Sequence, residues 1–393
     1  MSGSTNYLDQ LVAWRRHLHQ YPEISFHEHR TVAYIATELR ARLRHATFDN
    51  LTPTSLVVEL DTGRPGPRIG IRADIDGLAI QEDRPDLGFA SRVPDRMHAC
   101  GHDGHTAIVM AALAWADDNL DALSGQVVGI FQHAEETPPG GARELVATGY
   151  FDDFDFIYGF HLWTPMPTGQ VDIKDGRAST NADLFRITIN GQGGHASTPE
   201  LTIDPLIAAS QLIGQLQTVV SRRINALVPA VVSVTWLEAG DELALNVIAP
   251  QARLGGTVRT TDPQTRQKIQ DSMAQLLAGL EAAHPGLSCE LDYLVGYDMV
   301  WNDPARTSIV RELATARWGE AVTSEPPMLG GEDFAAFAEL VPATYVFIGA
   351  GNPDKGFTGS HHQPTFGLDE DAFPTAFELA VDVLRNGPRL AAG

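Results

Sequence analysis

Hydrophobic and polar positions alternate in two distinct ways along the chain. Residues 8–18 and 32–43 carry apolar side chains three or four positions apart, which predicts two amphipathic helices at the start. Short apolar or β-branched runs follow, separated by long helical stretches such as residues 106–116. The predicted strands are residues 56–60, 69–73, 127–131, 156–160 and 345–348. This order is typical of an α/β fold with a mostly parallel sheet covered by helices on both faces.

The middle of the chain follows a different order. Its strand-like and helical segments, in sequence, are residues 184–190, 205–220, 231–237, 253–260 and 263–283. A βαββα order suits a small α+β sandwich that forms a domain of its own. We therefore expect a discontinuous α/β domain of residues 1–179 and 292–393, interrupted by an inserted α+β domain of residues 180–291.

Composition and charge narrow the class of protein. Of the 393 residues, 43% are hydrophobic and 20% are charged, the balance of a globular protein with ample apolar surface to bury. The net charge of -22 repels nucleic acid and anionic membranes, so we expect neither as a partner. No run of about 18 apolar residues occurs, and the first residues lack the apolar core of a signal peptide. The expected location is the cytoplasm.

The use of cysteine indicates metal chemistry. Only Cys100 and Cys289 are present, which excludes a disulfide scaffold. Cys100 lies in the run Met-His-Ala-Cys-Gly-His-Asp-Gly-His at 97–105. A thiolate beside imidazoles suits zinc, manganese, cobalt or nickel, and suits magnesium or calcium poorly. An isolated Cys-Gly-His is more often a buried cysteine beside a helix-capping histidine, but three histidines in this run favour a metal site.

Reactive side chains follow four predicted strands of the α/β sheet. They are Asp74 and Asp76, Glu135 and Glu136, His161, and His362. Since open α/β sheets place their sites at the carboxyl ends of strands, we expect these side chains to meet at one edge, together with Cys100 and His102. A single histidine after a strand is more often structural. Asp76 is a candidate for orienting a liganding imidazole, with a turn-forming aspartate as the alternative.

The adjacent carboxylates Glu135 and Glu136 suit hydrolysis. One carboxylate holds a metal, while another takes a proton from the attacking water and delivers it to the leaving amine. Neighbouring side chains on an extended chain face opposite ways, so we expect a bend after the strand to bring both carboxylates to the site. Two solvated acids at the end of a strand are the alternative.

Together these residues resemble the aminoacylase and carboxypeptidase metallopeptidases, and within them the amidohydrolase branch that contains hippurate hydrolase and the indoleacetyl-amino-acid hydrolases. The resemblance runs over nearly the whole chain, and the run at 97–105 is its most specific part. Its other marks are residues 15–23, 72–76, the Glu135-Glu136 pair, 193–197, 330–334 and the His-x-Pro at 362–364. We interpret the region around Glu23 as packing.

The resemblance implies that the α/β domain is catalytic and binds two divalent transition-metal ions (Zn, Mn, Co or Ni). The implied ligands are Cys100, His102, Glu136, His161 and His362. The cysteine would bridge the two ions, and Glu135 would act as the general base. We prefer His362 to His361 because the family histidine stands two residues before the proline.

In the inserted domain the resemblance implies three further site residues. It places His195 over the scissile carbonyl of a neighbouring subunit, so the inserted domain would act as a lid and dimerisation domain in a homodimer. Asn246 and Arg259 are similar to groups that hold a carboxylate or carbonyl of the substrate, for which arginine offers a bidentate fork. A surface histidine in a hairpin and a turn-forming asparagine are the alternatives for His195 and Asn246.

These features predict a metal-dependent amidohydrolase that cleaves the linear amide bond of small N-acyl amino acids or related amides. A metallo-carboxypeptidase or dipeptidase that uses the same metals is a second interpretation. A catalytically silent relative that acts as a binding or scaffold protein is a third. The presence of Glu135 argues against the third, because binding alone requires no proton transfer.

Overall fold

The computed structural model describes residues 4–325 and 330–392, which form two compact units. Unit 1 holds the chain up to Ala178, residues 300–325 and the chain from Asp333 onward. Unit 2 holds Ser179–Met299 and residues 330–332. Each unit has its own hydrophobic core. Among the described residues, no helix is both long and apolar enough to cross a membrane.

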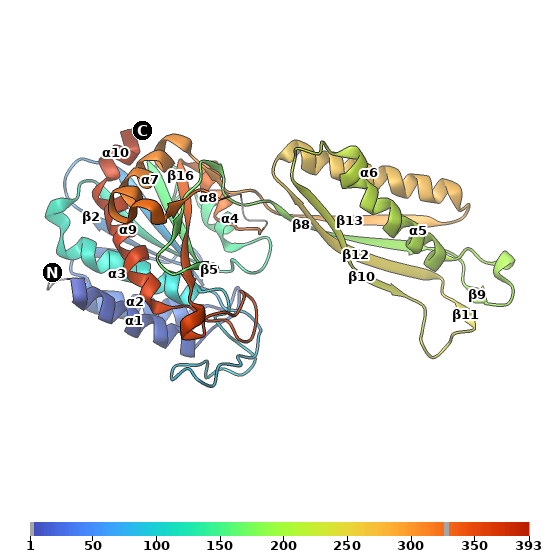
Figure 1. Cartoon of the computed structure of the whole chain (residues 1–393), viewed down its shortest axis with the longest axis horizontal. Helices are drawn as coiled ribbons and strands as arrows, with labels where there is room; N and C mark the ends of the chain where they lie inside the picture. Colours follow the sequence, from blue (N-terminus) through green and yellow to red (C-terminus); the bar gives the residue numbers. More distant parts are fainter. Residues whose placement is uncertain (1–3, 326–329, 393) are drawn as a thin grey trace. The chain divides into compact units, whose positions relative to one another are not determined.

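Unit 1 is built on an eight-stranded sheet (Figure 1). Its strands, in spatial order, are β1 (Ala46–Asp49), β2 (Leu56–Asp61), β4 (Gln126–Gln132), β3 (Arg68–Asp74), β5 (Phe156–Pro167), β16 (Ala343–Gly351), β6 (Val171–Asp172) and β15 (Val322–Thr323). Strand β3 runs parallel to β4 and β5, and β5 runs parallel to β16. The carboxyl ends of these four strands therefore lie at one edge, as their sequence positions predict.

Helices cover both faces of this sheet (Figure 1). They are α1 (Ser4–Gln20), α2 (His29–Arg42), α3 (His102–Asp118), α4 (Gly141–Val146), α7 (Pro304–Trp318), α8 (Ala335–Leu340), α9 (Phe373–Arg385) and α10 (Gly387–Ala392). Helix α3 is buried along nearly its whole length and packs against the sheet, α1 and α9. Helices α4 and α8 pack against each other on the opposite face. A two-stranded pair, β7 (Gly176–Arg177) and β14 (Trp301–Asn302), completes the unit.

Two glycines allow α3 to carry the cysteine-histidine run into the sheet edge. Gly101 has a φ of 97°, a left-handed conformation that favours glycine, and it turns the chain from Cys100 into the helix. Gly129 of β4 lets the helix approach closely, because a Cβ atom there would lie 2.5 Å from Leu113 Cδ1 of α3. The first turn of α3 is thereby fixed beside the strand ends.

Unit 2 is a four-stranded antiparallel sheet with two long helices along one face (Figure 1). In spatial order its strands are β10 (Ala230–Ala239), β12 (Gln251–Thr260), β8 (Ala182–Asn190) and β13 (Ser288–Tyr297), and its helices are α5 (Pro205–Thr218) and α6 (Pro263–Ala283). Phe185, Ile187 and Ile189 alternate along β8 and are buried in the core with the two helices. A short pair, β9 (Gly194–His195) and β11 (Val247–Ile248), lies outside this sheet.

The predicted fold class is confirmed, with one difference in the middle of the chain. The expected insertion ended at residue 291, which falls inside β13, and unit 2 continues to Met299. Strand β13 is an edge strand that pairs only with β8 in this sheet, and most of its side chains are exposed or half-buried. Its sequence therefore lacks the apolar run that marks the other strands, so the predicted βαββα order omitted it.

Candidate metal centre

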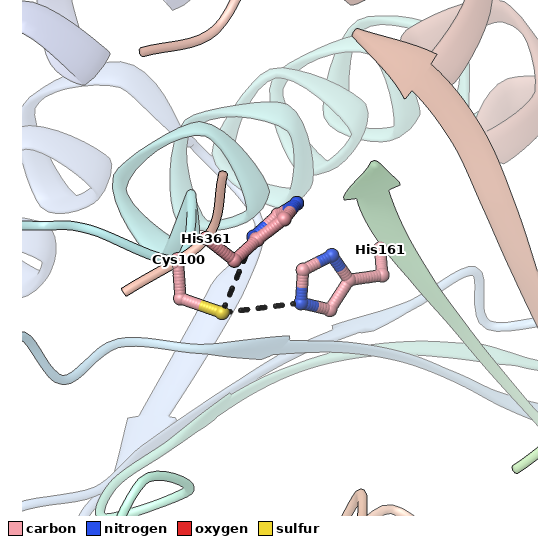
Figure 2. A group of neighbouring side chains, drawn as sticks. All are labelled: Cys100, His161 and His361. Atoms are coloured by element: carbon pink, nitrogen blue, oxygen red, sulfur yellow. Dashed lines mark hydrogen bonds between the residues drawn. The ribbon is translucent and has the colours of Figure 1, made fainter. Parts of the chain in front are cut away.

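A thiol lies at the carboxyl edge of the unit 1 sheet, between two imidazoles (Figure 2). Cys100 Sγ lies 3.5 Å from His161 Nε2 and 3.6 Å from His361 Nδ1. His161 Nδ1 lies 2.9 Å from the carbonyl oxygen of Leu162, to which it donates. That hydrogen bond leaves the Nε2 lone pair of His161 facing the thiol, which is the tautomer that a metal ligand requires.

Two further groups of ligand atoms extend this one, since the first shares Cys100 with it and the second shares Glu136 with the first. Cys100, Glu136 and His362 form the first, and His102, Glu135 and Glu136 form the second, with the ligand atoms of each group within 4.8 Å of one another. His362 Nε2 lies 3.2 Å from Glu136 Oε1. The structure thus brings together all five residues proposed as ligands and the proposed base.

Left-handed backbone conformations explain how neighbouring residues reach the same site. Ala134 has a φ of 52°, which provides the expected bend before Glu135 and Glu136. Glu28 Oε1 accepts a hydrogen bond from the Ala134 N–H (2.8 Å), and Asp76 Oδ2 accepts one from the Glu136 N–H (3.0 Å). These two buried carboxyl groups hold the bend from either side.

A second left-handed residue, His362 with a φ of 64°, lies in the loop after β16. Its N–H donates to the Ala99 carbonyl oxygen (2.9 Å), which ties the loop to the start of α3. In an extended chain His361 and His362 would face opposite ways, but here each belongs to a ligand group that includes Cys100.

His102 is oriented by Asp76. Its Nδ1 lies 3.1 Å from Asp76 Oδ1 and 3.0 Å from the Asp76 carbonyl oxygen. Burial lowers the pKa of His102, but the charges of Asp74 and Asp76 outweigh burial and raise that pKa to about 10. Its Nε2 is buried and has no hydrogen-bond partner, and the buried Glu136 Oε1 3.8 Å away has none either, apart from its ion-pair contact with His362. Orphaned polar atoms are costly in a protein interior, and a cation between them would satisfy both.

The charges around Cys100 also fit a cation. Burial, reinforced by the carboxylates of Glu136 and Glu135, raises the pKa of the Cys100 thiol well above its usual value. A bound divalent ion reverses this balance, because it favours the thiolate and neutralises the carboxylates. Sulfur and imidazole donors select a transition metal over magnesium or calcium.

Another buried group, Asp74 with His102 and His105, also has ligand spacing but is already hydrogen-bonded. Asp74 Oδ1 lies 2.7 Å from His105 Nδ1, and Asp74 Oδ2 accepts from Arg72 Nη1 (2.8 Å). His105 Nε2 accepts from the Leu162 N–H (2.9 Å). Both nitrogens of His105 are therefore used, so this residue anchors α3 to β3 and β5.

The sequence left two residues of the centre without a role. His361 was set aside in favour of its neighbour, although its adjacency to His362 was a usable signal. Glu28 stands in the run His-Glu-His-Arg at 27–30, which looks like a solvated surface. The sequence gives no sign that Glu28 is buried, and only the three-dimensional structure shows it.

The three remaining predicted residues lie in unit 2. His195 and Asn246 are exposed neighbours, because β9 pairs with β11 and the Ala196 N–H donates to the Asn246 carbonyl oxygen (3.0 Å). His195 Nδ1 accepts from the Ser197 N–H (3.1 Å). Arg259 lies separately on β12, and burial lowers the pKa of its half-buried guanidinium. Their action on a substrate stays a prediction.

The family model described as Peptidase family M20/M25/M40 matches residues 70–386. The chain belongs to this family. The match spans every residue proposed as a ligand, and it confirms the resemblance found in the sequence.

Relatives in the M20/M25/M40 family extend along most of the chain. It is 38% identical to the N-acetylcysteine deacetylase of Bacillus subtilis (strain 168), over 95% of this chain and 97% of that protein. It is 40% identical to the N-acyl-L-amino acid amidohydrolase of Geobacillus stearothermophilus, over 74% of this chain and 78% of that protein. The crystal structure of the Bacillus subtilis YXEP protein, described as a dinuclear metal binding peptidase, has a TM-score of 0.81 and 34% identity, covering 97% of this chain and 99% of that chain.

Proposed function

We propose that this member of the M20/M25/M40 family is a metal-dependent amidohydrolase that cleaves N-acyl amino acids or related small amides. The observation that carries the proposal is the position of Glu135, whose carboxylate lies within 4.8 Å of the ligand atoms of His102 and Glu136. A binding protein needs no carboxylate at this place. The names of the two relatives above support N-acyl amino acids as the substrate class.

Two divalent ions of zinc, manganese, cobalt or nickel would be held by Cys100, His102, Glu136, His161 and His362, and Cys100 belongs to two of the ligand groups. Such ions supply Lewis acidity for the amide carbonyl and lower the pKa of a water. Asp76 fixes the His102 ring through Nδ1, so that Nε2 is presented to the metal. The orientation of His102 as a ligand then depends on the Asp76 carboxylate, which lies on the opposite side of the ring from Nε2.

Glu135 is the proposed general base. Its carboxylate accepts a proton from the attacking water and then delivers this proton to the nitrogen of the leaving amine, which departs as the C–N bond breaks. Glu136, its neighbour, holds metal and is not available for the same task. The division of labour between the two carboxylates depends on the bend at Ala134.

In the proposed reaction, residues of unit 2 bind the substrate. His195 polarises the scissile carbonyl and stabilises the oxyanion, and Arg259 and Asn246 hold the carboxylate or carbonyl of the amino-acid part. His195 Nδ1 is occupied by the Ser197 N–H, so Nε2 is the nitrogen that would reach the oxyanion.

We also propose that the active unit is a homodimer formed through unit 2. Strand β10 is an edge of the sheet and exposes Trp236 and Leu237. The segment before β11 exposes Leu243 (90%) and Leu245 (86%). An edge strand with exposed apolar side chains favours pairing with a second copy about a two-fold axis. His195 would then act on the partner's metal centre.

A substrate panel tests the proposed function. Hippurate, N-acetyl amino acids and unblocked dipeptides are offered in parallel to the metal-loaded enzyme, and products are measured by mass spectrometry. We expect turnover of blocked amino acids. Preference for an unblocked dipeptide would indicate the carboxypeptidase or dipeptidase alternative. No turnover on the whole panel, with metals bound, would favour a silent binding relative.

A further inference from the structure

The metal centre contains one imidazole more than the proposed ligand set uses. The rings of His161 and His361 both point at Cys100 Sγ, and dashed lines mark the two contacts in Figure 2. The two rings are 5.2 Å apart and nearly perpendicular, at 65°. The two rings lie at nearly the same distance from the sulfur, so distance does not distinguish their roles. The hydrogen bond of the ring nitrogen that faces away from the sulfur decides whether the other nitrogen presents a lone pair or an N–H group.

His361 presents a proton to the sulfur. Its Nε2 accepts a hydrogen bond from the Thr164 N–H (3.2 Å), so Nε2 carries no proton and its lone pair is occupied. A neutral imidazole has one N–H, which must then be on Nδ1. The atom 3.6 Å from this Nδ1 is Cys100 Sγ, a distance at which sulfur accepts a hydrogen bond.

His161 presents the opposite group. Its Nδ1 donates to the Leu162 carbonyl oxygen (2.9 Å), so the lone pair of Nε2 faces the site. The same sulfur therefore faces a lone pair that suits a metal on one side and an N–H donor on the other. His361 therefore differs from the proposed ligands in its tautomer, because the nitrogen that faces the sulfur carries a proton and has no free lone pair for a metal.

The ring of His361 is held in this orientation by aromatic packing. It stacks on Trp163, with ring centroids 4.4 Å apart and an interplanar angle of 21°, and it also packs against Phe366 at 4.8 Å. A partial rotation about the Cβ–Cγ bond of His361 would break this stack, and a 180° flip, which keeps the ring plane, would break the Thr164 hydrogen bond. The N–H is thus preorganised toward sulfur.

We propose that His361 is a positioning residue that donates an Nδ1–H···S hydrogen bond to the bridging thiolate of Cys100. The inference rests on the proposed metal centre and goes beyond it, since it assigns a role to a residue outside the ligand set. The hydrogen bond withdraws electron density from sulfur, so the thiolate donates less to the metals and leaves them more electrophilic. It also fixes the direction of the sulfur between the two ligand groups.

Cobalt spectroscopy of the full chain tests the proposal. Co²⁺ bound by a thiolate gives a sulfur-to-cobalt charge-transfer band, and a hydrogen bond to sulfur moves this band to shorter wavelength. His361→Phe keeps the stack on Trp163 but has no N–H, so the band should shift to longer wavelength while the bound Co²⁺ stays at the wild-type amount. His361→Asn places an amide N–H near the former Nδ1, so the band should return toward that of the wild type.

Two controls separate the alternatives. His362→Phe removes a proposed ligand next to His361 and should lower the amount of bound Co²⁺. His361→Leu is a second donor-free variant that is smaller than histidine, so the result does not depend on how one large ring fits. Thermal unfolding of each variant reports packing losses independently of the band.

Three outcomes overturn the inference. Loss of Co²⁺ from His361→Phe to the extent seen in His362→Phe would make His361 a ligand. An unshifted band in both donor-free variants would mean that the N–H serves the backbone of Cys100 or only packing. A wild-type protein that binds no Co²⁺ would overturn the proposed metal centre itself, an outcome distinct from the other two.

Discussion

Replacing Glu28 tests whether the buried segment before α2 shapes the metal centre. Its Oε1 accepts hydrogen bonds from the N–H groups of Phe26 (3.0 Å) and Ala134 (2.8 Å). Glu28→Ala leaves both donors without this acceptor in the interior of the fold. The free energy of unfolding should fall by about 1–3 kcal/mol for the buried Ala134 N–H, and by less for the part-buried Phe26 N–H. Glu28→Gln keeps an acceptor oxygen and should fall far less.

The same carboxyl gives a pH signature. Burial, reinforced by the charge of Asp76, raises the pKa of Glu28 from 4.5 to about 8. Because the folded pKa is above the unfolded one, the stability from this group is fully present below about pH 4.5 and is lost as the pH rises through about 8. At about 1.4 kcal/mol per pKa unit, the wild type should lose on the order of 3 kcal/mol between about pH 5 and pH 7. Glu28→Gln should lack this loss.

Urea unfolding of the metal-free protein at several pH values measures both effects. Glu23→Ala is a matched control, because Glu23 Oε2 accepts from the Arg30 and Thr31 N–H groups of α2, whereas among the described residues the Ala134 N–H donates to Glu28. It should lower stability and leave metal content unchanged, whereas Glu28→Ala should lower both. Equal pH slopes for the wild type and Glu28→Gln, or equal stability of Glu28→Gln and Glu28→Ala, would refute the reasoning.

Other substitutions test the chemistry of the centre. Glu135→Gln should keep the metals but lower kcat by about 10² to 10⁴-fold, and near-normal rates at full metal content would remove Glu135 from the mechanism. Cys100→Ser should lower metal occupancy while Cys289→Ala should not; metal analysis that gave the reverse would contradict the ligand assignment. Glu135→Ala and His195→Ala subunits should each be inactive, yet an equal mixture should recover roughly a quarter of wild-type activity, since about half of the exchanged dimers hold one intact site. No recovery after confirmed exchange would place His195 in the site of its own chain.

The sequence grouped most residues of the candidate metal centre because they obey positional rules. Strand ends are visible as apolar runs, and parallel strands bring their carboxyl ends to one edge. This is why Glu136, His161 and His362 could be grouped from residues far apart in the chain, and why the structure finds each of them with Cys100 or its neighbours. Asp76 beside His102 follows from the same rule.

The remainder depends on features that no local pattern encodes. The left-handed conformation of His362 determines which ligand group each of the two histidines faces. The backbone N–H of Thr164 on β5 then fixes the orientation of the His361 ring. Glu28 was given no role by the sequence, because its contact with Ala134 joins segments 106 residues apart. Strand β13 was missed because an edge strand needs few buried side chains.

The placement of backbone strain has a consequence for engineering this enzyme. Four non-glycine residues in the described chain have positive φ, and Ala134 and His362 lie in the centre while Phe26 lies beside Glu28. Such conformations cost on the order of 1–3 kcal/mol each and persist only where the surroundings enforce them. Libraries selected for heat resistance alone would tend to relax these positions, so the first gains in melting temperature would come at the expense of turnover. Stabilising changes are better sought at exposed positions that do not contact Phe26, Ala134 or His362.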